Sequence, residues 1–152
     1  MNIDYKKKYL KYKIKYLEIK KEKKQKKLLG GELKIESELN EIMGGMKIDN
    51  NSFIELIKKT TENILVIIYA HWCYHCVNMI KYIGEKLKLD TNNTRIKYLD
   101  GTTLTKELKE KLEIQGFPTI IKISGDSDIN NLNKKEYEGP REVDDIIKFL
   151  GN

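Results

Sequence analysis

Both cysteines of this chain directly follow its longest apolar run, in the stretch ILVIIYAHWCYHC. Residues 64–70 are mostly β-branched and far fewer than the roughly 18 that a membrane-spanning helix needs, so they predict a buried strand. Apolar residues then recur at helical spacing, at Val77, Ile80, Ile83 and Leu87. The sequence therefore predicts a strand, a short turn that carries the cysteines, and a helix that begins near Cys73.

Four potential metal ligands lie together in this stretch: His71, Cys73, His75 and Cys76. A structural zinc site usually takes two ligand pairs from separate turns, but the chain has no other cysteine or histidine. A helix that begins at Cys73 would also turn His71 away from Cys76. Zinc held within one chain or shared between two is therefore the less favoured interpretation, and we predict no metal and no cofactor.

Dithiol chemistry fits the same residues better, because it needs a thiolate, a second thiol nearby and access for a substrate. The first turn of a helix offers unpaired N–H groups and the positive end of the helix dipole, and both stabilise a thiolate at Cys73. Cys76 follows one turn later, within disulfide reach. His75 adds a hydrogen-bond donor or a positive charge beside the Cys73 sulfur.

The elements around the cysteines alternate between strands and helices. Ser52 is the predicted N-cap of a helix over residues 53–60, with Glu55 completing a capping box. Strands are predicted at residues 64–69, 95–100, 118–124 and 134–139, and helices after Cys73, at 104–112 and at 142–150. This order predicts an α/β fold with a mixed central sheet and helices on both faces.

The positive charge of the chain is concentrated near its N-terminus. Residues 1–29 contain 12 lysines and three acidic residues, whereas residues 46–152 contain 16 basic and 16 acidic residues. Two heptads, YKKKYLK and YKIKYLE, place Tyr5, Tyr9, Tyr12 and Tyr16 on one stripe of a helix. Such a basic amphipathic helix could bind a partner protein or an anionic surface, or pair as a short coiled coil. It could also touch nucleic acid, but this is not favoured. A solvated lysine-rich helix is the plain alternative.

Two Gly-Gly pairs bracket an acidic segment behind this helix. Gly30-Gly31 is expected to end the first helix, because glycine costs about 1 kcal/mol in a helix interior. Gly44-Gly45 is expected to end a second, short helix. We therefore divide the chain into a basic helix at residues 1–29, a linker able to form a short helix at 30–45, and a globular domain at 46–152.

The globular part resembles a thioredoxin-fold domain, and most of all the catalytic domains of protein disulfide isomerases. Four stretches carry this resemblance: ILVIIYAHWCYHC, RIKYLDGTT, IQGFPTIIKISG and KEYEGPREVDDIIKFL. They occur in the order of the family and cover nearly all of the domain. The resemblance implies a thiol–disulfide oxidoreductase that exchanges disulfides in cysteine-containing protein substrates.

The resemblance also implies roles for single residues. Cys73 would attack the substrate, and Cys76 would resolve the mixed disulfide. Pro118 would be cis and would place the Phe117 backbone where an extended peptide can hydrogen-bond to it. Other residues are expected to act around this pair: Trp72, Tyr74 and Phe117 as an apolar rim for the substrate, and His75 and Arg141 as modulators of the cysteines.

Two positions depart from the family pattern. The family carries a buried Asp or Glu six residues before the first cysteine, which serves proton transfer with the second cysteine, and this position is Ile67 here. The usual proline five residues after the second cysteine is Lys81. These departures keep another function open: a weakly catalytic or non-catalytic thioredoxin-fold module that binds proteins and is tethered by its N-terminal helix.

The N-terminal segment YKKKYLKYKIKYLEIKK has a resemblance of its own, to N-terminal segments of proteins from giant DNA viruses. The lysines of this segment leave no apolar stretch typical of a secretory signal, and no run is long enough to cross a membrane. The expected location is therefore the virion or the cytoplasm of an infected host cell.

Overall fold

The computed structural model describes residues 3–87 and 95–151, without the side chains of residues 3–12, 23, 25–29, 32, 33 and 87. The chain forms two compact units, Met1–Ile35 and Glu36–Asn152. None of the described helices is both long enough and apolar enough to span a bilayer.

Helix α1 (Ile3–Met43) accounts for the whole described part of the first unit. Four described apolar side chains in it are exposed: Ile14, Tyr16, Leu17 and Ile19. The side chains of Tyr5, Tyr9 and Tyr12, which complete the predicted stripe, lie outside the described residues. The stripe as a whole therefore stays a prediction, although the helix that would carry it is present.

The helix end predicted at Gly30-Gly31 is wrong, because α1 continues through both glycines to Met43. No atom lies within 4 Å of the place where a Cβ would stand at either glycine, so close packing does not require them. Each glycine costs about 1 kcal/mol, but helical turns on both sides propagate cooperatively through the pair. The second pair does end the helix: a short 3-10 turn (Gly44–Met46) follows, and Gly44 has a φ of 48°.

The last turns of α1 pack against helix α3 (Tyr74–Leu87) within the second unit. Leu39 and Met43 are almost completely buried, and the Lys81 ammonium of α3 donates to the Glu38 carboxylate at 2.9 Å. A Cβ on Gly84 would overlap Ile42, so the absence of a side chain at Gly84 allows the two helices to approach. Residues 36–43, expected in a linker, are therefore packed helix; the predicted boundaries of the domains stay a prediction.

The second unit contains a five-stranded mixed sheet in the order β1-β3-β2-β4-β5. Strands β1 and β2 run parallel to β3, whereas β4 is antiparallel to β2 and to β5. The two-residue edge strand β1 was not predicted, and the other elements match the predicted order. Their bounds are β1 (Lys47–Ile48), α2 (Asn50–Lys59), β2 (Ile64–Tyr69), β3 (Ile96–Asp100), α4 (Lys106–Leu112), β4 (Thr119–Ile123), β5 (Lys134–Glu136) and α5 (Val143–Gly151).

Helix α2 and its N-cap both begin three residues earlier than predicted. Asp49, not Ser52, is the N-cap, and the Asp49 carboxylate accepts a hydrogen bond from the Ser52 amide at 2.7 Å. Aspartate and serine are comparable caps, so residue type alone does not favour Ser52 over Asp49. The Asp49 cap allows an additional turn to form before Phe53, which is fully buried.

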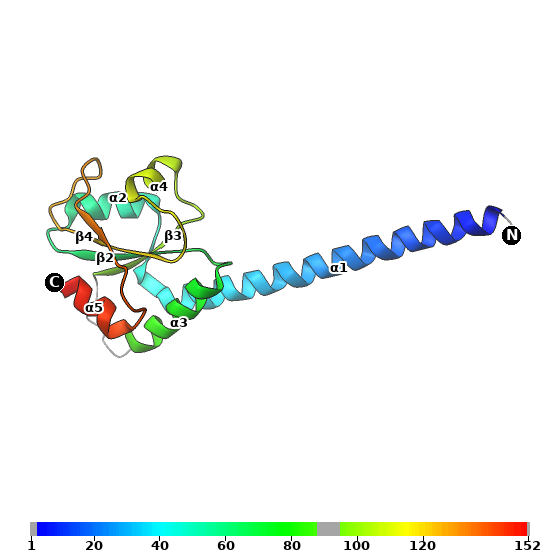
Figure 1. Ribbon diagram of the computed structural model, residues 1–152, viewed down its shortest axis with the longest axis horizontal. Helices are drawn as coiled ribbons and strands as arrows, with labels where there is room; N and C mark the ends of the chain where they lie inside the picture. Colours follow the sequence, from blue (N-terminus) through cyan, green and yellow to red (C-terminus); the bar gives the residue numbers. More distant parts are fainter. Residues whose placement is uncertain (1–2, 88–94, 152) are drawn as a thin grey trace. The chain divides into compact units, whose positions relative to one another are not determined.

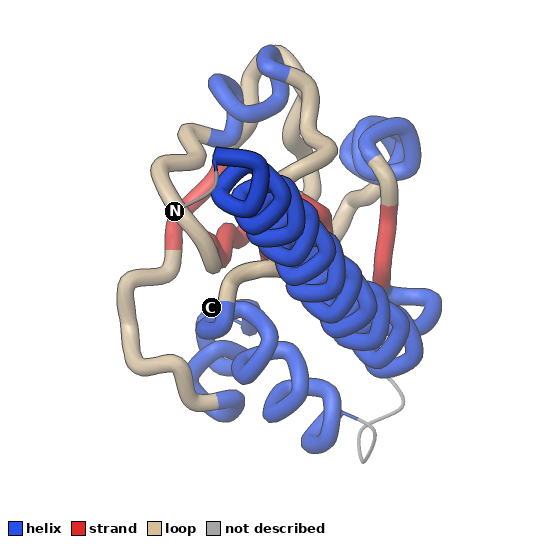
Figure 2. Tube along the Cα trace, turned by 90° about the vertical axis from the view of Figure 1, so that its right-hand side faces the viewer, coloured by secondary structure: helices blue, strands red, loops and turns tan. Residues whose placement is uncertain are grey.

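Helices α2 and α4 cover one face of the sheet, and α3 and α5 cover the other (Figure 1). The same two-sided arrangement appears after a rotation by 90° (Figure 2). On the first face, Val66 and Ile68 of β2 pack in one cluster with Phe53 of α2 and Leu108 of α4. Strand alternation places Leu65, Ile67 and Tyr69 on the second face. All six residues of β2 are buried, which explains why this strand reads as a continuous apolar run.

Candidate active site

The two cysteines lie at the carboxyl end of the central strand β2. The strand ends at Tyr69, and the Cys73 amide donates to the Ala70 carbonyl at 3.0 Å to close the turn that follows. The Cys73 carbonyl accepts from the Val77 amide at 3.0 Å, which makes Cys73 the residue just before the first turn of α3. The predicted sequence of strand, turn and helix is therefore present, with Cys73 at the start of the helix.

The two thiols differ in exposure. Both cysteines are free; Cys73 is partly exposed, whereas Cys76 lies in the core with 0% of its surface exposed. Burial raises the pKa of Cys76 to about 12, the adjoining Cys73 side chain adds to the rise, and the positive charge of Arg141 opposes it. At neutral pH Cys76 is therefore a protonated thiol out of contact with solvent, and Cys73 is the thiol that a substrate can reach.

The loop before β4 lies beside the accessible thiol. Because β4 is antiparallel to β2, the start of β4 meets the carboxyl end of β2. The Phe117–Pro118 peptide bond in this loop is cis, as predicted. The Cys73 Sγ donates to the Phe117 carbonyl at 3.6 Å. The Thr119 hydroxyl donates to the Gly116 carbonyl at 2.7 Å and so ties the two ends of the loop together.

Aromatic side chains surround Cys73. Trp72 and Tyr74, on either side of it in sequence, are 63% and 73% exposed. The Trp72 ring meets the Phe117 ring edge-on, with 5.9 Å between the ring centres, and Tyr74 meets His75 in the same way at 5.9 Å. Large exposed aromatic rings are uncommon away from binding surfaces. These rings therefore form an apolar rim around the accessible Cys73 sulfur.

Arg141 reaches the site from the segment between β5 and α5. Its Nη2 donates to the Pro118 carbonyl at 3.4 Å. The Tyr137 hydroxyl donates to the Pro140 carbonyl at 2.7 Å, and the Tyr137 ring lies where a Cβ on Gly139 would stand. The turn that precedes Arg141 is therefore held in place, and it directs the guanidinium toward the cis-proline loop.

This arrangement agrees with the comparisons to known proteins. The sequence profile of the Thioredoxin family matches residues 45–152. The chain belongs to the thioredoxin family. It is 35% identical over 102 residues to protein disulfide-isomerase A3 of Gallus gallus, which covers 65% of this chain and 19% of that protein. It is 34% identical over 106 residues to the protein disulfide-isomerase of Saccharomyces cerevisiae, which covers 69% of this chain and 19% of that protein.

The chain thus spans about a fifth of the length of these disulfide isomerases. Among solved structures, the first thioredoxin domain of mouse protein disulfide-isomerase A4 aligns with a TM-score of 0.56. That alignment has 19% sequence identity and covers 69% of this chain and 71% of that domain's chain, and it shows the fold. The predicted fold class, a thioredoxin fold with a mixed central sheet, is confirmed.

Ile67 occupies the position where the family resemblance implies a buried Asp or Glu. Ile67, six residues before Cys73, is 0% exposed and lies in register between Tyr98 of β3 and Ile120 of β4. The buried polar residues among the described part of the chain are Thr119 and Ser127, and no carboxylate is buried there. The interior of the described domain therefore contains no acidic side chain to exchange a proton with Cys76.

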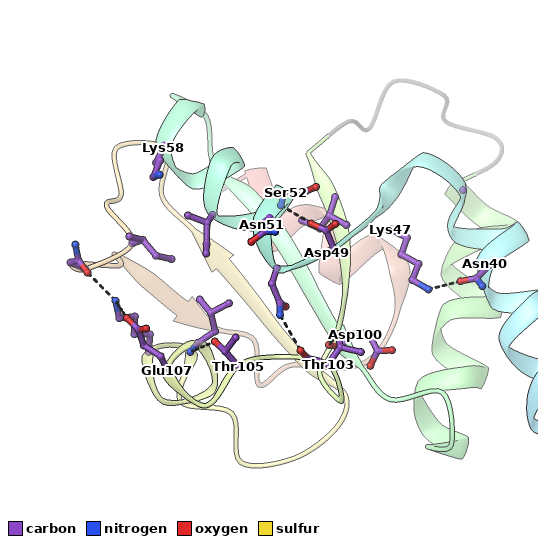
Figure 3. A pocket seen from close by; sticks show the side chains of 18 of the residues that line it. Asn40, Lys47, Asp49, Asn51, Ser52, Lys58, Asp100, Thr103, Thr105 and Glu107 are labelled. Atoms are coloured by element: carbon purple, nitrogen blue, oxygen red, sulfur yellow. Dashed lines mark hydrogen bonds and ion pairs between the residues drawn. The ribbon is translucent and has the colours of Figure 1, made fainter.

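A hollow of about 1130 Å³ lies away from the cysteines, at the amino ends of α2 and α4. Figure 3 shows that most of its polar side chains bond to one another or to the backbone. The Lys47 ammonium donates to the Asn40 side-chain oxygen at 2.6 Å, and the Asn50 amide donates to the Thr103 carbonyl at 3.0 Å. This hollow, hereafter the α2–α4 hollow, contains no thiol and no histidine.

The structure brings the predicted site residues together, but their roles stay predictions. A smaller hollow of about 400 Å³, hereafter the cysteine-side hollow, is lined by His75, Asn78, Met79, Tyr82, Phe117, Pro118 and Arg141. Asn78, Met79 and Tyr82 were not among the predicted site residues. They follow His75 by three, four and seven positions on α3, so helical spacing from His75 would have identified them. Trp72 and Tyr74 stand outside this hollow, on the exposed rim.

Proposed function

We propose that this thioredoxin-family protein is a thiol–disulfide oxidoreductase that exchanges disulfides in cysteine-containing proteins through Cys73 and Cys76. One observation supports this function above the others. An accessible thiol precedes the first turn of α3, a buried thiol with a raised pKa follows one turn later, and a cis-proline loop lies beside the accessible sulfur. The relatives named as disulfide isomerases add support from sequence.

The exchange proceeds in two balanced steps. The Cys73 thiolate attacks one sulfur of a substrate disulfide, so a bond forms between Cys73 and that sulfur while the other substrate sulfur leaves as a thiolate. Cys76 then loses its proton and attacks the Cys73 sulfur, which releases the second substrate thiolate. The substrate gains two electrons and the protein is left with a Cys73–Cys76 disulfide. The same steps in reverse oxidise a substrate dithiol, and a thiol or disulfide partner restores the starting state.

The surroundings of Cys73 favour an unfolded or extended protein as the substrate. The apolar rim of Trp72, Tyr74 and Phe117 covers the approach to the sulfur, and it would pack against apolar side chains that flank a substrate cysteine. The backbone of Phe117 borders the sulfur, where an extended peptide can add its own hydrogen bonds. His75 and Arg141 act as modulators of the two sulfurs in this proposal.

A trapping experiment tests the roles of the two cysteines. The Cys76→Ser variant is incubated with a disulfide-containing protein such as insulin, and mixed disulfides are detected by intact mass under non-reducing conditions. We expect Cys76→Ser to accumulate a covalent complex, because no second thiol resolves it. The matched Cys73→Ser variant should form almost none, because its remaining thiol is buried. Equal trapping by both variants would contradict the assignment of Cys73 as the attacking residue.

A second function, a protein-binding module with weak or no turnover, is favoured by one observation. Ile67 and its neighbours provide no carboxylate for proton transfer to Cys76, so the resolving step lacks the proton acceptor expected for this family. In this alternative, residues 1–29 tether the module to a partner protein or an anionic surface in the virion or in the cytoplasm of an infected cell. Insulin reduction with a dithiol donor separates the two functions, since a pure binding module leaves the uncatalysed rate unchanged.

A further inference from the structure

The cysteine-side hollow is lined by Phe117, whose carbonyl bonds to the Cys73 sulfur, and by Arg141, which forms no ion pair with any described carboxylate. Its seven lining residues come from α3, the cis-proline loop and the segment before α5. Resting on the disulfide exchange proposed above, we propose that this hollow binds an acidic side chain of the substrate within about two residues of its reacting cysteine. Arg141 is the residue that selects for it.

The charge around the hollow supports an anionic occupant. The Arg141 guanidinium contacts the Pro118 carbonyl, and among the described side chains no carboxylate forms an ion pair with it. The neighbouring carboxylate, Glu142, accepts a hydrogen bond from the Tyr82 hydroxyl at 3.0 Å and does not line the hollow. The permanent charge that lines the hollow is therefore positive, and a guanidinium that retains free donors suits a carboxylate.

The walls of the hollow suit the stem of such a side chain. Met79 and the Phe117 ring provide apolar surface, while the Asn78 amide and His75 provide polar groups at the opening. A volume of about 400 Å³ is at the lower end of the range for small-ligand pockets, roughly 300–1,000 Å³, which fits one side chain rather than a folded segment. Glutamate, with an apolar stem and a planar anionic head, matches this combination better than lysine or an aromatic residue.

The position of the hollow sets where the acidic residue must lie. The hollow shares Phe117 with the Cys73 sulfur, which bonds to the Phe117 carbonyl. A peptide that forms a mixed disulfide with Cys73 and extends along the loop advances about 3.3 Å per residue. A side chain one or two residues from the substrate cysteine therefore reaches Arg141, whereas one six residues away does not.

Single-turnover kinetics with the reduced full-length protein test this selection. Four peptides of one length each contain a single cysteine, linked as a mixed disulfide to the chromophore thionitrobenzoate. Attack of Cys73 on the peptide sulfur releases thionitrobenzoate, and Cys76 then releases the peptide thiol, so no added reductant is needed. The peptides have Glu, Gln or Lys next to the cysteine, or Gln next to the cysteine with Glu six residues away. Each rate is divided by the rate of the same peptide with free dithiothreitol.

We expect the peptide with adjacent Glu to react roughly two- to five-fold faster than the Gln peptide, the range of one partly exposed ion pair. The peptide with distant Glu should react like the Gln peptide, which excludes a general attraction by the lysine-rich residues 1–29. In Arg141→Gln the preference for adjacent Glu should disappear, and in Arg141→Glu the Lys peptide should become the fastest. Arg95→Gln, which removes the only other arginine of the chain, should keep the wild-type preference.

Arg141 also affects Cys76, so the ratio between peptides is the diagnostic quantity, because a change at the cysteines alters all four rates together. A Glu-to-Gln ratio that is unchanged in Arg141→Gln would overturn the selection by Arg141, and so would equal rates for adjacent and distant Glu. If no peptide reacts faster than with dithiothreitol at equal thiol concentration, disulfide exchange by this site fails as well. Fast but equal rates for all four peptides refute only the acidic preference.

Discussion

A comparison of the α2–α4 hollow with the cysteine-side hollow shows that the larger of the two has no group suited to disulfide exchange. The α2–α4 hollow is the larger, about 1130 Å³ against about 400 Å³, yet its polar groups are largely satisfied by one another. Lys111, for example, bonds both to Glu107 and to Asn130, each at 2.9 Å. The cysteine-side hollow has fewer polar groups, but its arginine forms no ion pair with a described carboxylate, and its Phe117 bonds to the accessible Cys73 sulfur.

This difference teaches that unsatisfied chemistry marks the functional surface better than volume does. Side chains that already bond to each other mainly stabilise the fold, because a ligand would have to replace those bonds. The Cys73 thiol and the Arg141 guanidinium each bond to one backbone carbonyl, and no ion pair between described side chains involves that guanidinium. We therefore expect substitutions at the α2–α4 hollow to change stability, and substitutions at the cysteine-side hollow to change reactivity.

The largest effect is expected from the accessible sulfur. Cys73→Ser should reduce the rate of insulin reduction to the uncatalysed background, because the remaining thiol is buried and protonated. The control from the other hollow is Asn130→Ala, which removes one bond from Lys111 and should leave the rate within about two-fold of wild type. Substantial turnover by Cys73→Ser would contradict the proposal that the exchange takes place at the Cys73 sulfur beside the cysteine-side hollow.

Features that depend on neighbouring residues in the sequence could be predicted, whereas features that depend on distant contacts could not. The apolar run of β2 and the spacing of Val77, Ile80 and Ile83 on α3 are local patterns, and both elements lie where predicted. The position of Cys73 before the first turn of α3 follows from the same patterns. The cis bond before Pro118 and the gathering of the aromatic rim were expected from a family resemblance, because nothing local to those residues shows their contacts.

Most of the missed features depend on contacts between distant segments, and the N-cap of α2 is a local exception. The last turns of α1 pack on α3, where Ile42 meets Gly84, and local helix propensity does not reveal this contact. The two-residue strand β1 exists only through its pairing with β3. The cysteine-side hollow forms where three separated segments meet, so helical spacing from His75 identifies Asn78 and Tyr82 as neighbours but does not show the hollow that they line.

The second largest effect tests the support of the aromatic rim. A Cβ at Gly101 would overlap the Phe117 ring and come within 3.0 Å of Ile68, while the Gly101 amide is fixed by its bond to Tyr69. Gly101→Ala should therefore displace the Phe117 ring, lower the free energy of unfolding by about 1–3 kcal/mol, and slow disulfide exchange several-fold. Denaturant unfolding and insulin reduction measure the two effects.

Gly116→Ala provides the matched control for that substitution. Gly116 lies in the same loop as Phe117, but apart from its two chain neighbours no described atom is within 4 Å of the place where its Cβ would stand. It should therefore change stability and turnover much less than Gly101→Ala does. If the two alanine variants behave alike, the contact between Gly101 and Phe117 does not hold the rim in position.

The third effect concerns the buried sulfur and depends on pH. Burial raises the pKa of Cys76 from 9.0 to about 12, so folding favours the protonated thiol. The associated stability is fully present below about pH 9 and is lost as the pH rises toward 12. In that window the reduced protein should lose up to about 1.4 kcal/mol per pH unit relative to Cys76→Ala. The buried tyrosines Tyr69 and Tyr98 titrate in both proteins, so their contributions cancel in the difference.

Unfolding in denaturant between pH 7 and 10.5, under reducing conditions, measures this difference. Below pH 9 the gap in stability between the two proteins should be constant, and above pH 9 it should move in favour of Cys76→Ala. A gap that stays constant throughout would mean that Cys76 ionises as readily as an exposed thiol. The contrast between a buried and an accessible cysteine would then fail, and with it the order of attack proposed here.

The smallest effect belongs to the α2–α4 hollow and completes the comparison. Asp49 lines that hollow and caps α2, where the backbone amide and then the hydroxyl of Ser52 hold its pKa below the usual range. Asp49→Ala should lower the free energy of unfolding by a small but measurable amount, because one amide of the first turn loses its acceptor. Asp49→Asn keeps an acceptor and should restore most of that loss.

Because a carboxylate with a lowered pKa stabilises the fold only while it is ionised, the difference in the free energy of unfolding between wild type and Asp49→Ala should shrink as the pH falls below about 4. Both variants should reduce insulin at the wild-type rate, and a loss of turnover larger than two-fold in either would show that the α2–α4 hollow contributes to the chemistry after all.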